Sequence, residues 1–401
     1  MSVTAAQGFV AAGVAAGIKA SGRPDLSLVA TADHRPVTAA GVFTTNLVAA
    51  APVQLSRRHL ATDTRAAAVL LNSGNANAAT GEPGLLVAEQ TAALAADALG
   101  CDRGHVLVCS TGLIGIPMAI DPFTTGVPAA AAALAATPEA GRSAAEAIMT
   151  TDTVPKEARA TFEAGGVDVT VGGMAKGAAM LSPAMATMLA VITTDAAVEP
   201  RALQLALSRA VDASFNLMTT DGSRSTNDTV LVLAGGAAGN APIATGTPEA
   251  HALADALTAV CASLADQMAH DAEGATKFVR LTVKGALSRT DALRAARAVA
   301  ESQLVKCSLF GGDPYWGRVL SELGASGAYL EPEKVDIAYN GFTVCLGGVA
   351  APGGFDADAL AKSMQQREIE ITADLRLGNG EATVTTVDLT PGYIDENMRT
   401  S

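Results

Sequence analysis

The amino-acid sequence predicts an α/β protein in which mixed, largely antiparallel sheets are layered with helices. Ala-rich segments that carry charges at helical intervals alternate with short β-branched runs. Several of these runs in the last third of the chain are hairpin-like neighbours, which favours antiparallel pairing over a doubly wound parallel sheet. The chain has 401 residues, 49% of them hydrophobic and 17% charged, so it can bury the core of two domains or two packed lobes.

The alternation of Ala-rich and β-branched segments predicts where the helices and strands lie in the chain. Amphipathic helices are expected at 84–99, 127–147, 199–213, 248–268 and 290–303. Pro200, which precedes a periodic run, is typical of the first turn of a helix. Residues 234–248, rich in Gly, Ala, Thr and Pro, are expected to form a surface loop. Strands are expected at 66–71, 105–109, 167–172, 188–194, 229–233, 278–283, 335–339, 342–346, 368–374 and 382–388.

Composition excludes several classes of function. Lys plus Arg number 27 against 40 for Asp plus Glu, and the net charge of −13 argues against nucleic acid or an anionic membrane surface as a partner. The five cysteines include no C-x-x-C pair and the five histidines no H-E-x-x-H pattern, so neither a disulfide framework nor a metal site is expected. No dinucleotide fingerprint or P-loop occurs, which disfavours a nucleotide cofactor. The N-terminus lacks the basic region of a signal peptide, so a cytoplasmic location is expected.

The most informative segment runs from Lys176 to Leu189 and reads KGAAMLSPAMATML. It places the hydroxyl of Thr187 directly after a small residue, Ala186. Attack of that hydroxyl on the Ala186 carbonyl would give an ester by an N-to-O acyl shift, and water would then release a chain that begins at Thr187. The new N-terminus would carry both a hydroxyl nucleophile and an α-amine. The amine could act as the base near neutral pH, since α-amines titrate at roughly 7.7–8.0. The pattern predicts a self-cleaving chain with an N-terminal threonine nucleophile.

Two other interpretations of this segment stay open from the residues alone. Thr187 could be a buried hydroxyl that donates to a nearby carbonyl. The uncharged run 177–194 approaches the roughly 20 residues that span a bilayer. Its Gly, Ser and Thr residues lower its hydrophobicity, and Pro183 would break a helix near its middle, so a membrane span is disfavoured.

Four polar clusters elsewhere could serve such chemistry. In CSTGLIG (109–115), the Thr111 hydroxyl and a backbone N–H at Gly112 could stabilise an oxyanion, or the segment could simply be a turn. MTTDTVPK (149–156) could bind a substrate amide or cap the next element. DGSRSTNDT (221–229) could organise the site or form a rigid polar turn. Glu273 could meet a substrate ammonium or be a solvated loop acid.

Together and in this order, these pieces resemble one family: the bifunctional ornithine acetyltransferases, or glutamate N-acetyltransferases, of arginine biosynthesis. The resemblance runs from about Gly17 to the C-terminus. Its most specific element is K-G-x-x-M-x-x-P-x-M-A-T-M-L, which includes Thr187. The matching pieces are LNSGNANAATG (71–81), STGLIG (110–115), AIMTTDTVPK (147–156), GGMAKGAAMLSPAMATML (172–189), DGSRSTNDTV (221–230), DAEGATK (271–277) and FGGDPYWGRV (310–319).

The resemblance implies an acyltransferase that cleaves itself between Ala186 and Thr187 into an α piece (1–186) and a β piece (187–401). The pieces would stay associated as interleaved chains in two lobes that divide near 280–290, and would pair into an α2β2 heterotetramer. The family's own α/β fold, shared with self-processing aminopeptidases, is implied as well. Thr187 would take acetyl from N2-acetyl-L-ornithine, release ornithine and pass acetyl to L-glutamate in ping-pong order. No cofactor is implied, and acetyl-CoA is a second acetyl donor in many members.

The resemblance also implies roles for single residues. Thr111 and Gly112 match the oxyanion-hole positions. Lys176 would bind a carboxylate or a developing negative charge, and Glu273 would pair with the side-chain ammonium of ornithine. A C-terminal hydroxy residue supplies a last contact, and because the tail after Asn397 is one residue short, both Ser401 and Thr400 are candidates. The positions that contact the substrate match Thr150, Lys176, Thr187, Glu273 and Asn397.

Two other functions remain compatible with the residues. A self-processed N-terminal-threonine amidase or aminopeptidase would use the same nucleophile with water as the acceptor. A non-enzymatic α/β binding protein would keep Thr187 as buried structure. The first would release acetate without needing glutamate, and the second would remain one undivided chain.

Overall fold

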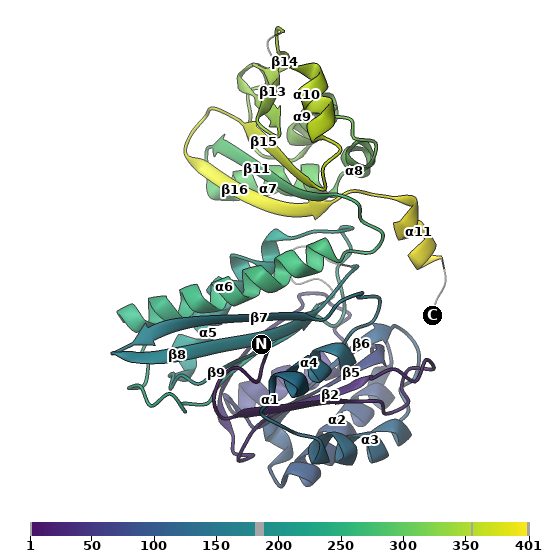
Figure 1. Ribbon diagram of the computed structural model, residues 1–401, viewed down its shortest axis with the longest axis vertical. Coiled ribbons are helices and arrows are strands. Elements are labelled where there is room, and N and C mark those ends of the chain that lie inside the picture. The colour runs from purple at the N-terminus through teal and green to yellow at the C-terminus, as the bar shows by residue number, and fades with distance from the viewer. Residues whose placement is uncertain (1, 181–187, 354–355, 399–401) are drawn as a thin grey trace. The chain divides into compact units, whose positions relative to one another are not determined.

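A computed structural model describes residues 2–180, 188–353 and 356–398 (Figure 1). The described residues form three sheets and divide into two compact units. Of the described residues, the first unit holds those up to Asn216 together with Ser223–Met268, and the second holds Leu217–Gly222 together with those from Ala269 to Met398. This division comes earlier in the chain than the expected boundary near 280–290, where a strand of the second unit pairs with neighbours on both sides.

The first sheet of the first unit has the strand order β1-β2-β5-β6. β1 (Phe9–Val14), β2 (Leu26–Thr31) and β5 (Ala68–Asn75) are antiparallel neighbours, and β6 (Val106–Leu113) is parallel to β5. Successive side chains point to opposite faces of a sheet, and both faces of this one are buried. That burial explains why β5 and β6 begin as continuous apolar runs instead of alternating ones.

The second sheet of the first unit has the order β4-β3-β10-β9-β8-β7. The central pair, β9 and β10, is parallel, and antiparallel neighbours β8 and β3 flank it on either side. β9 and β10 follow the Ala186–Thr187 bond in the chain, whereas β3 and β8 precede it. Segments from the two sides of that bond are therefore interleaved within one sheet. The bounds are β3 Val37–Phe43, β4 Arg65–Ala66, β7 Lys156–Ala164, β8 Val167–Lys176, β9 Leu189–Thr194 and β10 Thr229–Ala234.

The two sheets share one hydrophobic core, and helices cover their outer faces (Figure 1). Val69 and Leu71 of β5 point into the shared core with Val191 of β9, while Leu70 packs on the opposite face with α2 and α3. A Cβ at Gly173 of β8 would meet side chains of α6, which places that helix on the outer face of the second sheet. The helices are α1 Ala51–Thr62, α2 Gly81–Leu99, α3 Asp121–Ala132, α5 Pro200–Asp212 and α6 Pro248–His270, together with α4 Pro138–Ala147, whose Ala144 and Ala145 pack into the shared core instead.

The second unit is built on a sheet of order β14-β13-β12-β15-β11-β16, in which only the β11–β15 pair is parallel among the described strands. One hydrophobic core joins this sheet to α7, α8 and α9. The strands are β11 Phe278–Ala286, β12 Asp336–Tyr339, β13 Phe342–Leu346, β14 Val349–Ala350, β15 Glu368–Asp374 and β16 Gly380–Val387. The helices are α7 Arg289–Glu301, α8 Gln303–Phe310, α9 Trp316–Ala325, α10 Ala357–Ser363 and α11 Pro391–Asn397.

The mixed, largely antiparallel α/β class is confirmed, and two helix predictions need correction. The single helix expected at 127–147 is two helices, because Thr137 caps a new start by accepting the Ala140 N–H, ahead of Pro138. The helix expected at 290–303 ends at Glu301, because Ser302 accepts the Val305 N–H and begins α8. The prediction also missed β2 and three strands whose Ala, Gly or charged residues dilute the strand signal, namely β1, β3 and β7.

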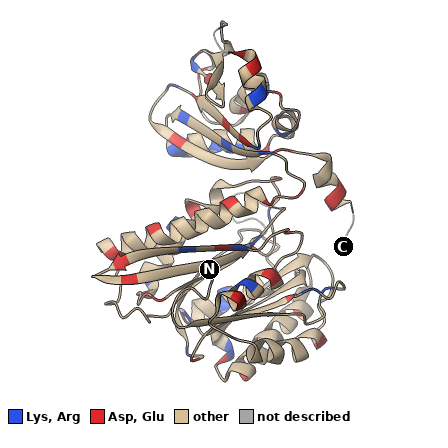
Figure 2. Ribbon diagram, in the orientation of Figure 1, with Lys and Arg blue, Asp and Glu red and all other residues tan. Residues whose placement is uncertain are grey.

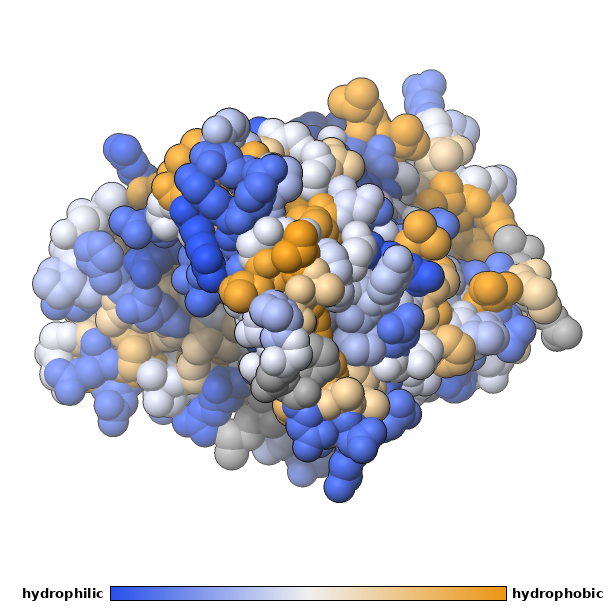
Figure 3. Space-filling model, turned by 90° about the horizontal axis from the view of Figure 1, so that it is seen from above, coloured by the Kyte–Doolittle hydropathy of each residue, from blue (hydrophilic) through white to orange (hydrophobic). Residues whose placement is uncertain are grey.

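The surface is polar and mixed in sign. Acidic and basic residues are spread along the helices and strands of both units (Figure 2). Exposed hydrophobic side chains form small groups among hydrophilic ones on the face drawn in Figure 3, an ordinary pattern for a folded protein surface. Among the described helices, none is long and apolar enough to cross a membrane.

Candidate active site

The two oxyanion candidates lie at the end of β6. Thr111 is 2% exposed, whereas Gly112 beside it is exposed. Gly112 has a φ of 132°, and a Cβ there would lie 2.3 Å from the backbone carbon of Gly74 in β5. Only glycine therefore allows β5 and β6 to approach so closely at this point. A buried hydroxyl next to exposed backbone is an arrangement suited to an oxyanion hole.

Lys176, the last residue of β8, brings three of the predicted residues together. Its side chain is 3% exposed, and its Nζ donates to Thr150 Oγ1 at 2.7 Å and to Thr111 Oγ1 at 3.4 Å. In the register of the second sheet Lys176 pairs with Leu189, the residue two positions after Thr187 in the chain. The ends of β6 and β8 and the loop before β7 therefore converge on one ammonium group.

A buried carboxylate, Asp152, balances part of this positive charge. Its Oδ1 lies 2.5 Å from Lys156 Nζ and its Oδ2 lies 3.8 Å from Lys176 Nζ. It also accepts the backbone N–H groups of Thr150 at 3.0 Å and Gly177 at 2.8 Å. Burial alone would raise the pKa of Asp152, but the ammonium groups of Lys176 and Lys156 outweigh burial and lower that pKa to about 2.

Two buried ammonium groups around one carboxylate leave a net positive charge in a place with little water. Such a place favours a substrate carboxylate or a negatively charged transition state. The Asp-x-x-x-Lys spacing of Asp152 and Lys156 was present in the sequence as part of MTTDTVPK, but nothing in the sequence indicated that both side chains would be fully buried.

Lys19 adds a third ammonium that no sequence motif marks. Its Nζ donates to the carbonyl oxygen of Met149 at 2.7 Å and to that of Pro24 at 3.0 Å. Burial first, and then the charge of Arg23, lower the pKa of Lys19 to about 8, and the ammonium of Lys176 contributes as well. Lys19 therefore fixes the residue that precedes Thr150, from a position far away in the chain.

The polar cluster at 221–229 connects the two sheets of the first unit through Asn227 and Asp228. Asn227 Nδ2 donates to the carbonyl oxygens of Ser110 at 2.8 Å and Ala76 at 2.7 Å. Asp228 Oδ1 accepts the backbone N–H of Met188 at 2.9 Å. Two adjacent side chains thus hold the residue before Thr111 and the residue after Thr187.

The second unit brings together the two other predicted residues that the structure describes. Asn397, at the end of α11, donates from Nδ2 to Glu273 Oε2 at 2.7 Å and to the Tyr393 carbonyl oxygen at 2.8 Å. α11 packs closely on the loop after α6, since a Cβ at Gly274 would lie 2.3 Å from the Tyr393 nitrogen. The short helix therefore aims its amide at the loop carboxylate.

With this geometry in view, comparison with known proteins decides the family. The chain matches the ArgJ family over residues 10–400. The chain belongs to the ArgJ family. The resemblance drawn from its motifs is thereby confirmed.

Individual ArgJ relatives are similar over nearly the whole chain. The arginine biosynthesis bifunctional protein ArgJ of Symbiobacterium thermophilum is 51% identical over 395 residues, which are 98% of this chain and 97% of that protein. The protein of the same name from Streptomyces coelicolor is 47% identical over 397 residues, 99% of each chain. A solved structure of ornithine acetyltransferase from Mycobacterium tuberculosis, complexed with ornithine, is 44% identical, covers 45% of this chain and 94% of that chain, and has a TM-score of 0.41.

Three predicted ArgJ site residues and one alternative lie outside the described part of the chain. These are Ala186 and Thr187 at the predicted cleavage bond, and Ser401 with its alternative Thr400 at the C-terminus. Among the described residues, no group of three or more His, Cys, Asp or Glu side chains could hold a metal ion.

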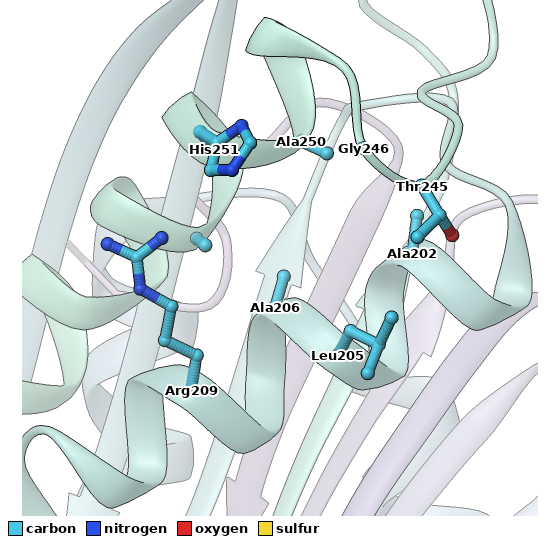
Figure 4. Close-up of a pocket in the computed structure, with 9 residues that line it drawn as sticks. Ala202, Leu205, Ala206, Arg209, Thr245, Gly246, Ala250 and His251 are labelled. Carbon is cyan, nitrogen blue, oxygen red and sulfur yellow. The ribbon is translucent and has the colours of Figure 1, made fainter.

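A separate cavity of about 250 Å³ lies between α5 and the start of α6 (Figure 4). Its walls are mainly alanine and Leu205, with Arg209, Thr245 and His251 at its polar edge. Arg209 is already paired with Asp255 at 2.9 Å. None of the predicted site residues lines this cavity, so the candidate chemistry is assigned to the Lys176 cluster instead.

Proposed function

We propose that this chain transfers acetyl from N2-acetyl-L-ornithine to L-glutamate, with Thr187 as the nucleophile after cleavage of the Ala186–Thr187 bond. As a member of the ArgJ family, it is an acyltransferase of arginine biosynthesis. The relatives' names call them bifunctional, which supports acetyl-CoA as a second acetyl donor to glutamate. We also propose a cytoplasmic location, as the site of the pathway's soluble substrates.

The observation that carries the proposal is the convergence of Thr111, Thr150 and Lys176. Hydroxyl and ammonium donors gather at the end of β8, from which the chain continues through residues 177–188 to β9. Donors placed in advance in a water-poor environment stabilise developing negative charge without reorganising, and this is usually the largest single contribution to catalysis.

In the proposed reaction, the Thr187 hydroxyl attacks the acetyl carbonyl of acetylornithine and its proton moves to the α-amine of Thr187. The carbonyl oxygen becomes an oxyanion, which Thr111 and Gly112 stabilise. The C–N bond then breaks, the α-nitrogen of ornithine takes up the proton, and acetyl remains as an ester on Thr187. Attack by the α-amine of glutamate on that ester reverses these steps and gives N-acetylglutamate.

Substrate recognition is assigned to charges of opposite sign. We assign Lys176 and Thr150 to the carboxylate common to both amino acids, because the net positive charge there matches an anion. We assign Glu273, oriented by Asn397, to the side-chain ammonium of ornithine. Ser401 or Thr400 remains the proposed C-terminal contact.

The second sheet supports the proposal that the pieces stay together after cleavage. β8, from the 1–186 piece, pairs with β9 over six residues, and β3, also from that piece, pairs with β10 over six residues. Separating the pieces would expose these ladders and the core beneath them. We propose that the paired pieces form an α2β2 assembly.

The test is Thr187→Ala, compared with wild type by intact mass and by acetyl transfer from N-acetylornithine to glutamate. Wild type is expected to yield the 1–186 and 187–401 pieces and to form N-acetylglutamate. Thr187→Ala should remain one folded chain without activity, and Thr187→Ser should be cleaved more slowly. Normal cleavage or activity in Thr187→Ala would refute the mechanism. Release of acetate at the same rate without glutamate would favour a hydrolase.

A further inference from the structure

The short helix α11 is held by hydrogen bonds more than by apolar burial. None of its seven residues, all of which the structure describes, is buried. A helix of this length has little stability of its own, so contacts with the rest of the second unit must fix its position. Because Asn397 is the last residue of α11, the same contacts decide where its amide meets Glu273.

Two of these contacts come from residues near the start of α11. Thr390, which caps the helix by accepting the Tyr393 N–H, donates from Oγ1 to the carbonyl oxygen of Gly274 at 2.7 Å. The phenol of Tyr393 donates from Oη to Asp221 Oδ2 at 3.2 Å. The first contact ties α11 to the loop that contains Glu273, and the second ties it to a segment far away in the chain.

Asp221 lies on a segment that is fastened within the second unit. This segment, Leu217–Gly222, belongs to that unit together with α8 and β16. Lys306 of α8, which is 3% exposed, donates from Nζ to the Thr220 carbonyl oxygen at 2.7 Å and to the Val387 carbonyl oxygen at 2.6 Å. The residue before Asp221 is therefore joined to the end of β16, the strand that precedes α11.

We propose that Asp221 and Tyr393 are positioning residues for recognition of the side-chain ammonium of the acetyl donor. The carboxylate of Asp221 anchors the Tyr393 hydroxyl, and with it the helix. The helix in turn directs the Asn397 amide, which donates both to the Tyr393 carbonyl oxygen and to Glu273. The inference rests on the proposed function, which assigns Glu273 to the ammonium of ornithine.

The charges around Tyr393 keep its hydroxyl in the donating form. Burial first, and then the charge of Asp221 and the hydrogen bond to it, raise the pKa of Tyr393, and the charge of Glu273 adds to the rise. The phenol is therefore neutral and able to donate at neutral pH. This contact also gives a role to the first residue of the polar cluster at 221–229.

The experiment compares Tyr393→Phe with wild type on two acetyl donors. N2-acetyl-L-ornithine carries the side-chain ammonium, and N2-acetyl-L-norvaline has the same carbon chain without it. Phenylalanine keeps the ring but cannot donate to Asp221. We expect KM for acetylornithine to rise about 3- to 10-fold with kcat nearly unchanged. The kcat/KM for acetylnorvaline and the KM for glutamate should stay at their wild-type values.

Three further variants sharpen the comparison. Asp221→Ala removes the acceptor instead of the donor and should raise KM for acetylornithine by a similar factor. In a Glu273→Gln background, Tyr393→Phe should cause little further change, because the charge that it positions is gone. Tyr329→Phe, at an exposed tyrosine of the same unit, is the control and should match wild type. Circular dichroism and intact mass check that each variant is folded and cleaved as wild type is.

The outcomes separate the inference from the proposed function. A loss confined to acetylornithine supports the inference. An equal loss of kcat/KM on both donors would show a merely structural role, and unchanged values in Tyr393→Phe and Asp221→Ala would also overturn the inference; either result leaves the proposed transfer intact. Absence of acetyl transfer in wild type would instead refute the proposed function, and a wild-type KM for acetylornithine in Glu273→Gln would refute its assignment of the ammonium.

Discussion

Two groups of residues, one around Lys176 and one around Glu273, differ in how firmly the fold holds them. In the first unit, Lys176, Asp152 and Lys156 are each less than 5% exposed; Lys156 begins β7, Lys176 ends β8, and Asp152 lies in the loop before β7. In the second unit, Glu273 lies in a loop and Asn397 ends a seven-residue helix, where its side chain is exposed. One group is built into a core, and the other is supported by a short surface element.

This difference in rigidity matches two different roles, transition-state stabilisation for the first group and substrate recognition for the second. Stabilising a transition state requires donors that do not move, and burial among strand ends supplies that rigidity. Recognising the far end of two different substrates tolerates, and even benefits from, adjustable contacts. We therefore expect substitutions in the first group to act on kcat or on folding, and substitutions in the second to act on KM.

The largest effect is expected for Lys176→Met. The Met side chain fills similar space but donates nothing to Thr111 or Thr150, so the oxyanion loses charge stabilisation. We expect kcat for acetyl transfer to fall about 100- to 1000-fold. The measurement is the initial rate of N-acetylglutamate formation on protein whose cleavage is complete by intact mass.

Lys156→Met is the matched control for Lys176→Met. Lys156 bonds the same carboxylate from the start of β7, and its removal leaves Asp152 with one ammonium partner fewer. Breaking a buried pair costs about 3–5 kcal/mol of stability, so urea unfolding should shift strongly while kcat of the folded fraction stays near wild type. Equal losses of kcat in both variants would contradict the assignment of separate roles.

The pH dependence of stability offers a second contrast, between two buried aspartates with opposite pKa shifts. The pKa of Asp152 is lowered to about 2 in the folded chain, so its contribution is fully present above its unfolded value of 3.8 and is lost as pH falls toward 2. The pKa of Asp228 is raised, so its contribution is present below 3.8 and is lost as pH rises above that value.

These signs predict opposite behaviour for two Asn variants in a Thr187→Ala background, which keeps the chain uncut. Relative to that parent, Asp152→Asn should lose most stability near pH 5 to 7 and little near pH 2. Asp228→Asn should become relatively more stable as pH rises from about 4 to 7. Urea unfolding midpoints at several pH values measure both trends, and parallel curves for the two variants would exclude this assignment of charges.

A smaller effect, on recognition, is expected for Glu273→Gln. The variant keeps a hydrogen bond to Asn397 but loses the negative charge that we propose to pair with the ornithine ammonium. Hydrogen bonds to charged groups contribute about 1.5–3 kcal/mol, so KM for acetylornithine should rise about 10- to 100-fold while kcat changes little. Glu396→Gln, an exposed acid beside Asn397 on α11, is the control and should leave KM unchanged. A drop in kcat alone would place Glu273 in the chemical step instead.

Sequence reasoning predicted the parts of this molecule whose signal is local. Periodic Ala-rich segments such as 84–99 and 248–268 are helices, and β-branched runs such as 229–233 are strands. Motif resemblance also identified Lys176, Thr111 and Thr150, which the structure brings into hydrogen-bond contact. The motifs carried this information because each contains one of the residues that meet at Lys176.

What the sequence did not predict depends on contacts between distant segments. Lys19 meets Met149 across 130 positions of chain, and Asn227 meets Ser110 across 117. Burial of Asp228 and Lys156 is a property of the assembled sheets, since charged residues are usually exposed. The Ala- and Gly-rich strand β1 was missed for a related reason: it is buried by its neighbours and not by any strong preference of its own.

The smallest effect is expected for Lys19→Met, which tests how the buried residues around Lys176 and Thr150 are held in place. The ammonium of Lys19 donates a hydrogen bond to the carbonyl oxygen of Met149, the residue before Thr150, and so helps to fix the position of Thr150. Losing one such hydrogen bond should raise KM for glutamate about 2- to 10-fold, with kcat little changed. In wild type, titration should weaken the same bond, because the pKa of Lys19 is about 8 and a neutral amine donates a weaker hydrogen bond than an ammonium. KM should therefore rise as pH increases through that value, and Lys19→Met should show no such rise.

Arg23→Met then tests whether that inflection belongs to Lys19. The positive charge of Arg23 lowers the pKa of Lys19, so its removal should raise that pKa and move the inflection in KM to higher pH. Arg23 is exposed and forms no part of the hydrogen bonds to Met149, so KM below pH 7 should stay at the wild-type value. An inflection that stays in place in both variants would show that another group titrates, and that Thr150 does not depend on Lys19 for its position.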